Sequence, residues 1–462
     1  MQKLDACLVE TSAEAGAIPV YATTAANADS VLQDLAAPMA DWARANAFAG
    51  SAGSVLALPA EGGGIGAALL GLGDGDADPF AAAALHKLPP GTYRLESGFD
   101  DPAQSVLGFA LSAYRYERYV KSKDKAVRLV VPAGVDGIDV DRIVAASRLT
   151  RDLVNAPAND LGPAELAAAV RRVGERYGAA VTVTEGRALE EGFPLIHAVG
   201  AASPRAPRLV DLKWGPEDAP KVTLVGKGVV FDTGGLDIKP PSAMLLMKKD
   251  MGGAAHALGL AQMIMDAALP VRLRLLIPTV ENAIAGNAFR PGDVFKSRKG
   301  LTVEIGNTDA EGRLILADAL ALADEEAPEL MIDFATLTGA ARVALGPELP
   351  ALFTADDTLA EAIARNGAAV NDPSWRLPLW PGYRAWLKSD IADINHITTQ
   401  PLAGAITAAL FLERFVEKAG AWVHLDLFAW SQSDRPGHPK GGAAQTIRGL
   451  YALLKERTGV SR

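Results

Sequence analysis

Near its midpoint the chain reads Val222-Thr-Leu-Val-Gly-Lys-Gly-Val-Val-Phe-Asp-Thr-Gly-Gly-Leu-Asp-Ile-Lys239. The apolar start of this stretch, residues 222–225, predicts a buried strand that runs directly into the glycine-flanked Lys227. Asp232 and two further glycines follow, and glycines at such places let the backbone approach a ligand closely. One lysine or aspartate alone is most often a solvated loop charge, but a cluster of charges directly after a strand indicates a binding site.

Predicted strands and helices alternate through the second part of the chain. The strands are expected at residues 222–225, 271–277, 330–334 and 422–428, and the helices between them at 254–268, 314–326 and 406–417. This alternation predicts an α/β domain with a mixed sheet and helices on both faces. Ligands of such sheets lie beyond the carboxyl ends of the strands, which is where the charged stretch around Lys227 falls.

The first part of the chain predicts a second, smaller α/β domain. Its strands are expected at residues 6–9, 19–23, 54–59, 67–72 and 126–131, and its helices at 28–47 and 101–119. A helix at 139–154 follows and ends in Asn155-Ala-Pro-Ala-Asn159, which is turn chemistry. We therefore expect an N-terminal domain at 1–135, a linking helix and turn at 136–160, and the larger domain at 161–462.

Composition excludes several classes of protein. The 462 residues carry a formal net charge of −10, which disfavours non-specific binding to nucleic acid or to an anionic membrane. Cys7 is the single cysteine, so neither an intrachain disulfide nor a thiolate metal cluster is expected. The N-terminal sequence lacks the pattern of a signal peptide, and no apolar run reaches the length of a membrane helix. These features predict a cytoplasmic globular protein without a membrane partner.

Two further motifs carry clustered charges. In Met247-Lys-Lys-Asp-Met-Gly-Gly-Ala-Ala255, Asp250 lies just before a predicted helix, where capping of that helix is an equally plain explanation. In Ile305-Gly-Asn-Thr-Asp-Ala-Glu-Gly-Arg-Leu314, Asp309, Glu311 and Arg313 alternate. In an extended segment alternate side chains point to one side, so the three would converge on one point. Capping explains one of these residues but not all three.

The charge of the combined cluster predicts metal ions. Asp232, Asp250, Asp309 and Glu311 supply four negative charges, which would repel one another and raise each other's pKa if they were grouped without cations. Two divalent cations would neutralise them. Oxygen ligands suit Mn²⁺ or Mg²⁺, and Zn²⁺ also accepts carboxylates. Two neighbouring cations can together activate water for hydrolysis.

Other chemistries fit the sequence less well. It contains neither a His-Glu-x-x-His zinc helix nor a Gly-x-Ser-x-Gly nucleophile elbow. Gly226-Lys-Gly228 begins like a dinucleotide fingerprint, but Phe231 occupies the third glycine position. His424, in the predicted strand at 422–428, is interpreted as a hydrogen-bonded structural histidine.

The three motifs together resemble the leucyl (cytosol) aminopeptidase family of dinuclear metallopeptidases. Asn307-Thr-Asp-Ala-Glu-Gly-Arg-Leu314 matches the family signature at all eight positions, and the motifs at 226–239 and 250–254 match in residue type and separation. The resemblance covers about residues 160–462. It implies metal-dependent removal of the first residue from peptides, with the cations activating water, and a homohexamer with a separate N-terminal α/β domain.

The resemblance also implies a role for each matching residue. One metal ion would be held by Asp232, Asp309 and Glu311, and the other by Lys227, Asp232, Asp250 and Glu311. Lys239 would polarise the scissile carbonyl, and Arg313 would anchor a bicarbonate ion that serves as general base. The implied substrate pocket contains Met247, Asn307, Thr336 and Leu337. After Asp426 the chain departs from the family pattern, because Leu427-Phe-Ala-Trp430 stands where small residues are usual.

Two other functions remain as alternatives. Some relatives of this family also bind DNA as architectural proteins, although the acidic charge of this chain disfavours that role. A dinucleotide-dependent oxidoreductase would rest only on the imperfect glycine patterns. The preferred N-terminal residue, the native metal at each site and the physiological peptide do not follow from the sequence.

Overall fold

The computed structural model describes residues 5–75, 77–121 and 126–460. The chain divides into two compact units, one made of Met1–Arg148 with Gln432–Lys440 and the other of Leu149–Ser431 with Gly441–Arg462. Each unit has its own sheet, which confirms the predicted smaller N-terminal and larger C-terminal α/β domains. The chain passes from the first unit to the second within helix α4 (Gly137–Asn155). The domain boundaries at 135 and 160 stay a prediction.

The first unit contains a six-stranded sheet in the order β1-β6-β5-β2-β4-β3. All neighbours are parallel except β3 and β4. The strands are β1 (Leu8–Val9), β2 (Ile18–Thr24), β3 (Val55–Pro59), β4 (Ile65–Gly73), β5 (Gly91–Ser97) and β6 (Val127–Val130). The helical segments are η1 (Thr11–Gly16), α1 (Ala28–Gln33), α2 (Ala37–Ala45), η2 (Ala81–Lys87) and α3 (Pro102–Ser112). The five strands predicted here are confirmed, and β5 was not predicted.

The single helix predicted at 28–47 is wrong, because the chain breaks between α1 and α2. Pro38 lies in the first turn of α2, and Ala36, the N-cap residue of that helix, has non-helical backbone angles. A proline has no amide hydrogen, and its ring would collide with the carbonyl of residue 34 if the helix continued through it. The apolar periodicity across the break did indicate buried positions, because Leu32 of α1 and Ala40 of α2 both pack in one hydrophobic cluster.

The second unit is built on a nine-stranded mixed sheet in the order β16-β15-β18-β14-β9-β11-β8-β7, with β10 pairing with β11. Its strands are β7 (Ala180–Glu185), β8 (Arg208–Trp214), β9 (Lys221–Gly226), β10 (Gly228–Asp232), β11 (Arg272–Asn282), β14 (Leu330–Ala335), β15 (Ala351–Phe353), β16 (Trp375–Arg376) and β18 (Trp422–Asp426). The four strands predicted from apolar runs are β9, β11, β14 and β18. They are neighbours in the centre of the sheet and run parallel, so their carboxyl ends share one edge.

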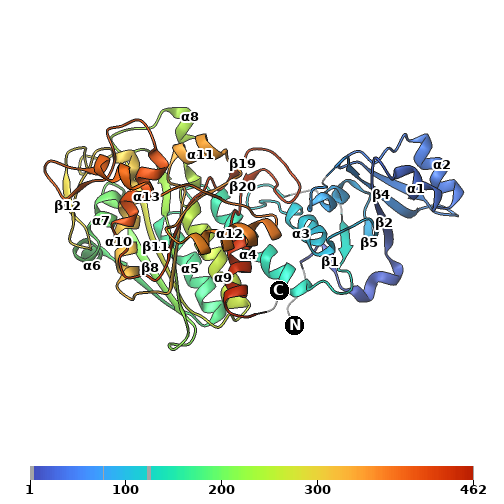
Figure 1. Ribbon diagram of the computed structural model, residues 1–462, viewed down its shortest axis with the longest axis horizontal. Coiled ribbons are helices and arrows are strands. Elements are labelled where there is room, and N and C mark those ends of the chain that lie inside the picture. Colours follow the sequence, from blue (N-terminus) through green and yellow to red (C-terminus); the bar gives the residue numbers. More distant parts are fainter. Residues whose placement is uncertain (1–4, 76, 122–125, 461–462) are drawn as a thin grey trace. The chain divides into compact units, whose positions relative to one another are not determined.

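Helices cover both faces of this sheet, as predicted. In Figure 1 α7, α10 and α13 lie on one side of it and α5 and α9 on the other. The helical segments are α5 (Pro163–Tyr177), α6 (Gly186–Gly192), α7 (Pro194–Gly200), α8 (Pro241–Met244), η3 (Met247–Lys249), α9 (Gly252–Asp266), η4 (Thr308–Ala310), α10 (Glu311–Asp324), α11 (Gly339–Leu345), α12 (Asp357–Ala369), η5 (Pro381–Leu387), α13 (Gly404–Glu413) and α14 (Ile447–Arg457). None of the described helices is both long and apolar enough to cross a membrane.

The remaining strands form two small sheets. One contains β12 (Val294–Lys296), β13 (Thr302–Glu304) and β17 (Ile394–Asn395), and the other pairs β19 (Trp430–Ser431) with β20 (Gly441–Gly442). Helices α9 and α10 flank the central strands and are buried along almost their whole length. Because both helices begin at the carboxyl edge of the sheet, their first turns bring the second and third charged motifs to the end of β9.

Candidate metal centre and substrate pocket

A cavity of about 580 Å³ opens at the carboxyl edge of the central strands. Ten of the eleven site residues predicted from the sequence line it, and the eleventh, Glu311, is buried beside Lys227. The ten are Lys227, Asp232, Lys239, Met247, Asp250, Asn307, Asp309, Arg313, Thr336 and Leu337. The structure therefore brings together residues that are separated by up to 110 positions in the chain.

Lys227 lies at the point where the three motifs meet. Its amide donates to Phe334 O on β14, and its carbonyl accepts from the amide of Ala254 on α9. A Cβ atom added to Gly253 would overlap the carbonyl of Phe334, and one added to Gly312 would overlap the Lys227 side chain. Glycine in the second and third motifs thus makes room for Lys227.

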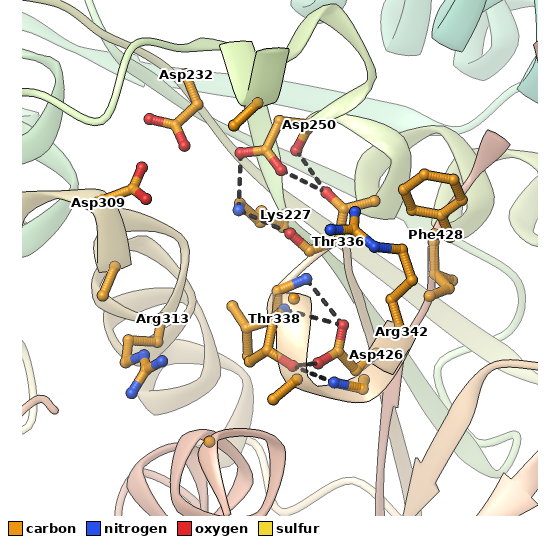
Figure 2. Close-up of a pocket in the computed structure, with 18 of the residues that line it drawn as sticks. Lys227, Asp232, Asp250, Asp309, Arg313, Thr336, Thr338, Arg342, Asp426 and Phe428 are labelled. Carbon is orange, nitrogen blue, oxygen red and sulfur yellow. Dashed lines mark hydrogen bonds and ion pairs between the residues drawn. The ribbon is translucent and has the colours of Figure 1, made fainter. Parts of the chain in front are cut away.

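Two lysines bridge the four carboxylates. Lys227 Nζ lies 2.8 Å from Asp250 Oδ2 and 3.0 Å from Glu311 Oε1. Lys239 Nζ lies 2.8 Å from Asp232 Oδ2 and also forms an ion pair with Asp309. Figure 2 shows Asp232, Asp250 and Asp309 directed toward the same space around Lys227.

The carboxylate oxygens at this point are available as metal ligands. One oxygen each from Asp232, Asp309 and Glu311 lies within 4.8 Å of the others, which is a spacing that a metal ion could bridge. Apart from the lysine ion pairs, Asp250 Oδ2, Asp309 Oδ1 and both Glu311 oxygens accept no hydrogen bond from the part of the chain that the structure describes. Buried carboxylate oxygens are normally satisfied, so these acceptors fit cations as their partners.

The electrostatics of the four carboxylates also indicate that cations bind here. Burial, with Asp250 beside it, raises the pKa of Asp232 to about 6. Burial also raises the pKa of Glu311 well above its usual value, and Asp232 adds to the effect. Lys227 and Lys239 supply two positive charges against four carboxylates, which leaves two negative charges in a buried site. Added positive charge is therefore needed for all four groups to be ionised together.

The backbone that positions Asp309, Glu311 and Arg313 differs from the one predicted. They do not alternate along an extended segment, because Asp309 lies in η4 and the other two in the first turn of α10. The side chain of Asn307 caps η4 by accepting from the amide of Asp309, so neither Asp309 nor Glu311 acts as a cap. The tight turn and the helix start, rather than strand alternation, direct both carboxylates to Lys227.

The competing structural interpretation of Asp250 is also wrong. The N-cap residue of α9 is Met251, which forms no side-chain capping bond. Asp250 instead accepts from Thr336 Oγ1 at 2.8 Å and pairs with Lys227. His424, by contrast, is the structural histidine that was predicted, since it is buried and its Nδ1 lies 2.6 Å from Asp333 Oδ1.

Arg313 is a buried cation with spare hydrogen-bonding capacity. Its Nη1 donates to His396 O at 2.8 Å, and burial lowers its pKa to about 10. Its Nε has no hydrogen-bond acceptor among the described residues. A guanidinium with a free donor at the edge of the cavity can bind a small planar anion such as bicarbonate.

The sequence did not identify several residues that line the same cavity. Asp426 ends β18 and accepts from the amides of Leu337 and Thr338 and from Thr338 Oγ1, so it holds the loop after β14 in place. Its position at the end of a predicted parallel strand could have revealed it. Lys249, Arg342 and Phe428 also line the cavity, and burial lowers the pKa of Lys249 to about 8.

Comparisons with known proteins agree over both units. Residues 148–451 match the model for the cytosol aminopeptidase family, catalytic domain, and residues 18–132 match the M17 aminopeptidase, N-terminal domain. A probable cytosol aminopeptidase of Roseiflexus castenholzii is 42% identical over 370 residues, covering 76% of this chain and 75% of the relative. One of Chlorobium limicola is 37% identical over 93% of this chain and 94% of its own.

Solved structures of similar proteins also match nearly the whole chain. The crystal structure of a cytosol aminopeptidase from Coxiella burnetii superposes with a TM-score of 0.94 at 47% identity, over 98% of this chain and 99% of that one. The bottromycin maturation enzyme BotP in complex with Mn superposes with a TM-score of 0.86 at 34% identity, over 96% of this chain and 99% of that one.

Proposed function

Because the chain belongs to the cytosol aminopeptidase family and is a metallo-aminopeptidase, we propose that it hydrolyses the first bond of peptides with two divalent cations bound around Lys227. The observation that supports the proposal best is the group of four carboxylates, three of them buried, in which Asp250, Asp309 and Glu311 have oxygens that accept no hydrogen bond from the described residues. Their negative charge exceeds that of the two lysines by two. The donors fit a hard or borderline cation such as Mn²⁺ or Zn²⁺.

The cluster offers ligands for both cations. Asp232, Asp309 and Glu311 would hold one, and Lys227 and Asp250 would hold the other together with the shared Asp232 and Glu311. Asp232 is held in place for this role, because its Oδ1 accepts from the amide of Gly234 and from Asn282 Nδ2, both at 2.8 Å. When bound, two such cations lower the pKa of water and polarise a peptide carbonyl.

Lys239 and Arg313 would complete the chemistry. Lys239 is partly exposed to the cavity, where its ammonium can stabilise the negative charge that develops on the carbonyl oxygen. Arg313 would hold bicarbonate through its free Nε donor, and bicarbonate bound there would accept a proton from the attacking water. Asn307, Met247, Thr336 and Leu337 would contact the substrate.

Replacing Lys239 by methionine should lower kcat while both metal ions stay bound. Loss of one donor to a developing oxyanion costs about 10²- to 10³-fold in kcat. The measurement is turnover of Leu-Ala-amide beside metal content. Lys296→Met, at an exposed position on β12, is the matched control and should keep normal kcat. A Lys239→Met enzyme with normal kcat would remove the proposed role of this lysine.

N-acetylated peptides should not be cleaved. A free α-amine has a lone pair that it can share with a cation, whereas the nitrogen of an acetylated amine is conjugated with its carbonyl. The test compares release of the first residue from Leu-Ala-amide and acetyl-Leu-Ala-amide by the metal-loaded enzyme. Comparable rates on the two substrates would contradict recognition of the free amine.

Lys227→Arg should lose one metal ion and most turnover. Burial alone would lower the pKa of Lys227, but Asp250, Glu311 and Asp232 outweigh it and raise that pKa above its usual value. A bound cation opposes these carboxylates, so a neutral lysine could act as a ligand, which arginine cannot do at accessible pH. If Lys227 serves only as an ion-pair partner, the variant will hold both ions and stay active, and the ligand assignment is then wrong.

Four further predictions concern the oligomeric state, the location, DNA binding and the substrate class. The homohexamer and the cytoplasmic location stay predictions that rest on the resemblance and on composition. The DNA-binding alternative gains no support from the comparisons. Peptides are the substrate class that the family membership implies.

A further inference from the structure

Three residues of the cavity have no part in the proposed chemistry, and they contact one another. Lys249 ends η3, Arg342 lies on α11, and Phe428 follows β18. Lys249 Nζ lies 4.6 Å from the centre of the Phe428 ring, and Arg342 Cζ lies 5.0 Å from it. One aromatic ring therefore holds two cationic groups at the wall of the substrate pocket.

Neither of these cations has a carboxylate partner among the described residues. Lys249 is only 5% exposed, and a lysine this deeply buried is normally paired. Within the same cavity, Lys227 and Lys239 each pair with two carboxylates. Lys249 thus lines the cavity with an ammonium group that has no carboxylate partner in the described part of the chain, and the same holds for the nearby guanidinium of Arg342.

The nearby carboxylates of the protein are already engaged. Asp426 accepts three hydrogen bonds from Leu337 and Thr338. Asp250 is bound by Lys227 and Thr336, and it belongs to the proposed metal centre. An acceptor from outside the protein can therefore reach the Lys249 ammonium without displacing one of these carboxylates from its partners.

The position of these cations indicates which part of a substrate meets them. In Figure 2 Arg342 and Phe428 lie on the same side of the cavity as Asp250 and Thr336, with Asp309 and Arg313 across from them. Under the proposed function, on which this step rests, an α-amine bound to the cation held by Lys227 and Asp250 would carry the first side chain on the adjacent Cα. Lys249 directly precedes Asp250 and lines the same cavity as Arg342, so the first side chain is the part of the substrate that these cations could meet.

We propose that Lys249 and Arg342 form a subsite for an acidic side chain, so that peptides beginning with glutamate or aspartate are preferred substrates. The substrate carboxylate supplies the acceptor that Lys249 lacks, and the guanidinium of Arg342 binds the same group. The ring of Phe428 keeps both cations in place and packs against the methylene groups of a glutamate side chain. A neutral first residue leaves the buried ammonium without an acceptor.

The test compares substrates that differ only in charge, and it uses the metal-loaded enzyme. Glu-Ala-amide and Gln-Ala-amide are nearly equal in shape, and neither has a free terminal carboxylate. A charge-assisted contact predicts that kcat/KM is at least ~10-fold higher for the glutamate substrate. Lys249→Met should bring that ratio to about one or below, and Arg342→Met should lower it. Because the ratio is taken within each variant, a general loss of activity does not affect it.

Lys248→Met is the matched control. Lys248 is the neighbour of Lys249 on η3, but its Nζ donates to Asn155 O at 2.6 Å and it does not line the cavity. This variant should keep the ratio of the unaltered enzyme. A ratio near one in the unaltered enzyme, or an unchanged ratio in Lys249→Met, would overturn the subsite.

A second pair of substrates, Ala-Glu-amide and Ala-Gln-amide, tests the position of the acidic residue. We expect similar kcat/KM values for the two, and a preference that appears only here would overturn the assignment to the first residue. Turnover of Leu-Ala-amide distinguishes failure of the proposed subsite from failure of the proposed aminopeptidase function. If Leu-Ala-amide and Gln-Ala-amide are cleaved without a preference for glutamate, only the subsite is wrong. If no amide is cleaved, the proposed function fails as well.

Discussion

Replacing Glu311 by alanine is expected to lower turnover of Leu-Ala-amide by at least ~10³-fold, because water activation and carbonyl polarisation each contribute several kcal/mol to catalysis. Glu311 is 1% exposed and touches Lys227, and we propose that its carboxylate is shared by both cations. Its removal takes one negative charge from the cluster and leaves Lys227 paired with one carboxylate, that of Asp250. The variant should therefore bind both cations weakly.

The matched control for this variant is Glu325→Ala. Glu325 lies at the other end of the same helix, is exposed, and pairs with Arg298. Exposed pairs of this kind contribute about 1 kcal/mol or less, so both stability and turnover should stay close to normal. Circular dichroism and thermal unfolding would establish that the Glu311→Ala protein is folded. A folded Glu311→Ala enzyme with two bound ions and near-normal turnover would contradict its role as a shared ligand.

The central strands of the larger domain could be predicted because they are buried on both faces. Such strands read as continuous apolar runs, and β9, β11, β14 and β18 were all found in this way. Parallel neighbours then place their carboxyl ends on one edge, and the cavity opens at that edge. Edge strands such as β7 alternate between half-buried and exposed residues, and they were not predicted.

Local geometry at the site could not be derived from periodicity. Asp309 and Glu311 were expected on an extended segment, but a short 3₁₀ turn and a helix start place them at Lys227. The charge pattern therefore predicted residues that the structure brings together, but on an incorrect backbone. Gly253 and Gly312 likewise serve the packing of Lys227, which depends on contacts between segments far apart in the sequence.

The role of the subsite residues could not be predicted from the sequence for a different reason. Lys249 and Arg342 are ordinary charges in the sequence, and Phe428 lies in the stretch 427–430 that departs from the family pattern but to which no role was assigned. Their significance depends on the absence of a partner for Lys249 within the described chain, which only the folded structure reveals. In contrast, the break of the helix predicted at 28–47 could have been recognised from Pro38 alone.

Removal of the metal ions should abolish activity completely and reversibly. Without cations, the carboxylates at Asp232 and Glu311 are held by two lysines and burial raises their pKa values, so the cavity retains no means of activating water. Addition of Mn²⁺ or Zn²⁺ should restore both the charge balance and the chemistry. Activity should follow the number of ions bound per chain.

The most direct test measures metal content and turnover of Leu-Ala-amide on the same samples, before exhaustive chelation, after it, and after addition of Mn²⁺ or Zn²⁺. We expect two ions per chain in the active protein, background turnover once both are removed, and recovery when both sites are filled again. Full turnover by protein verified to be free of metal would contradict the two-metal account.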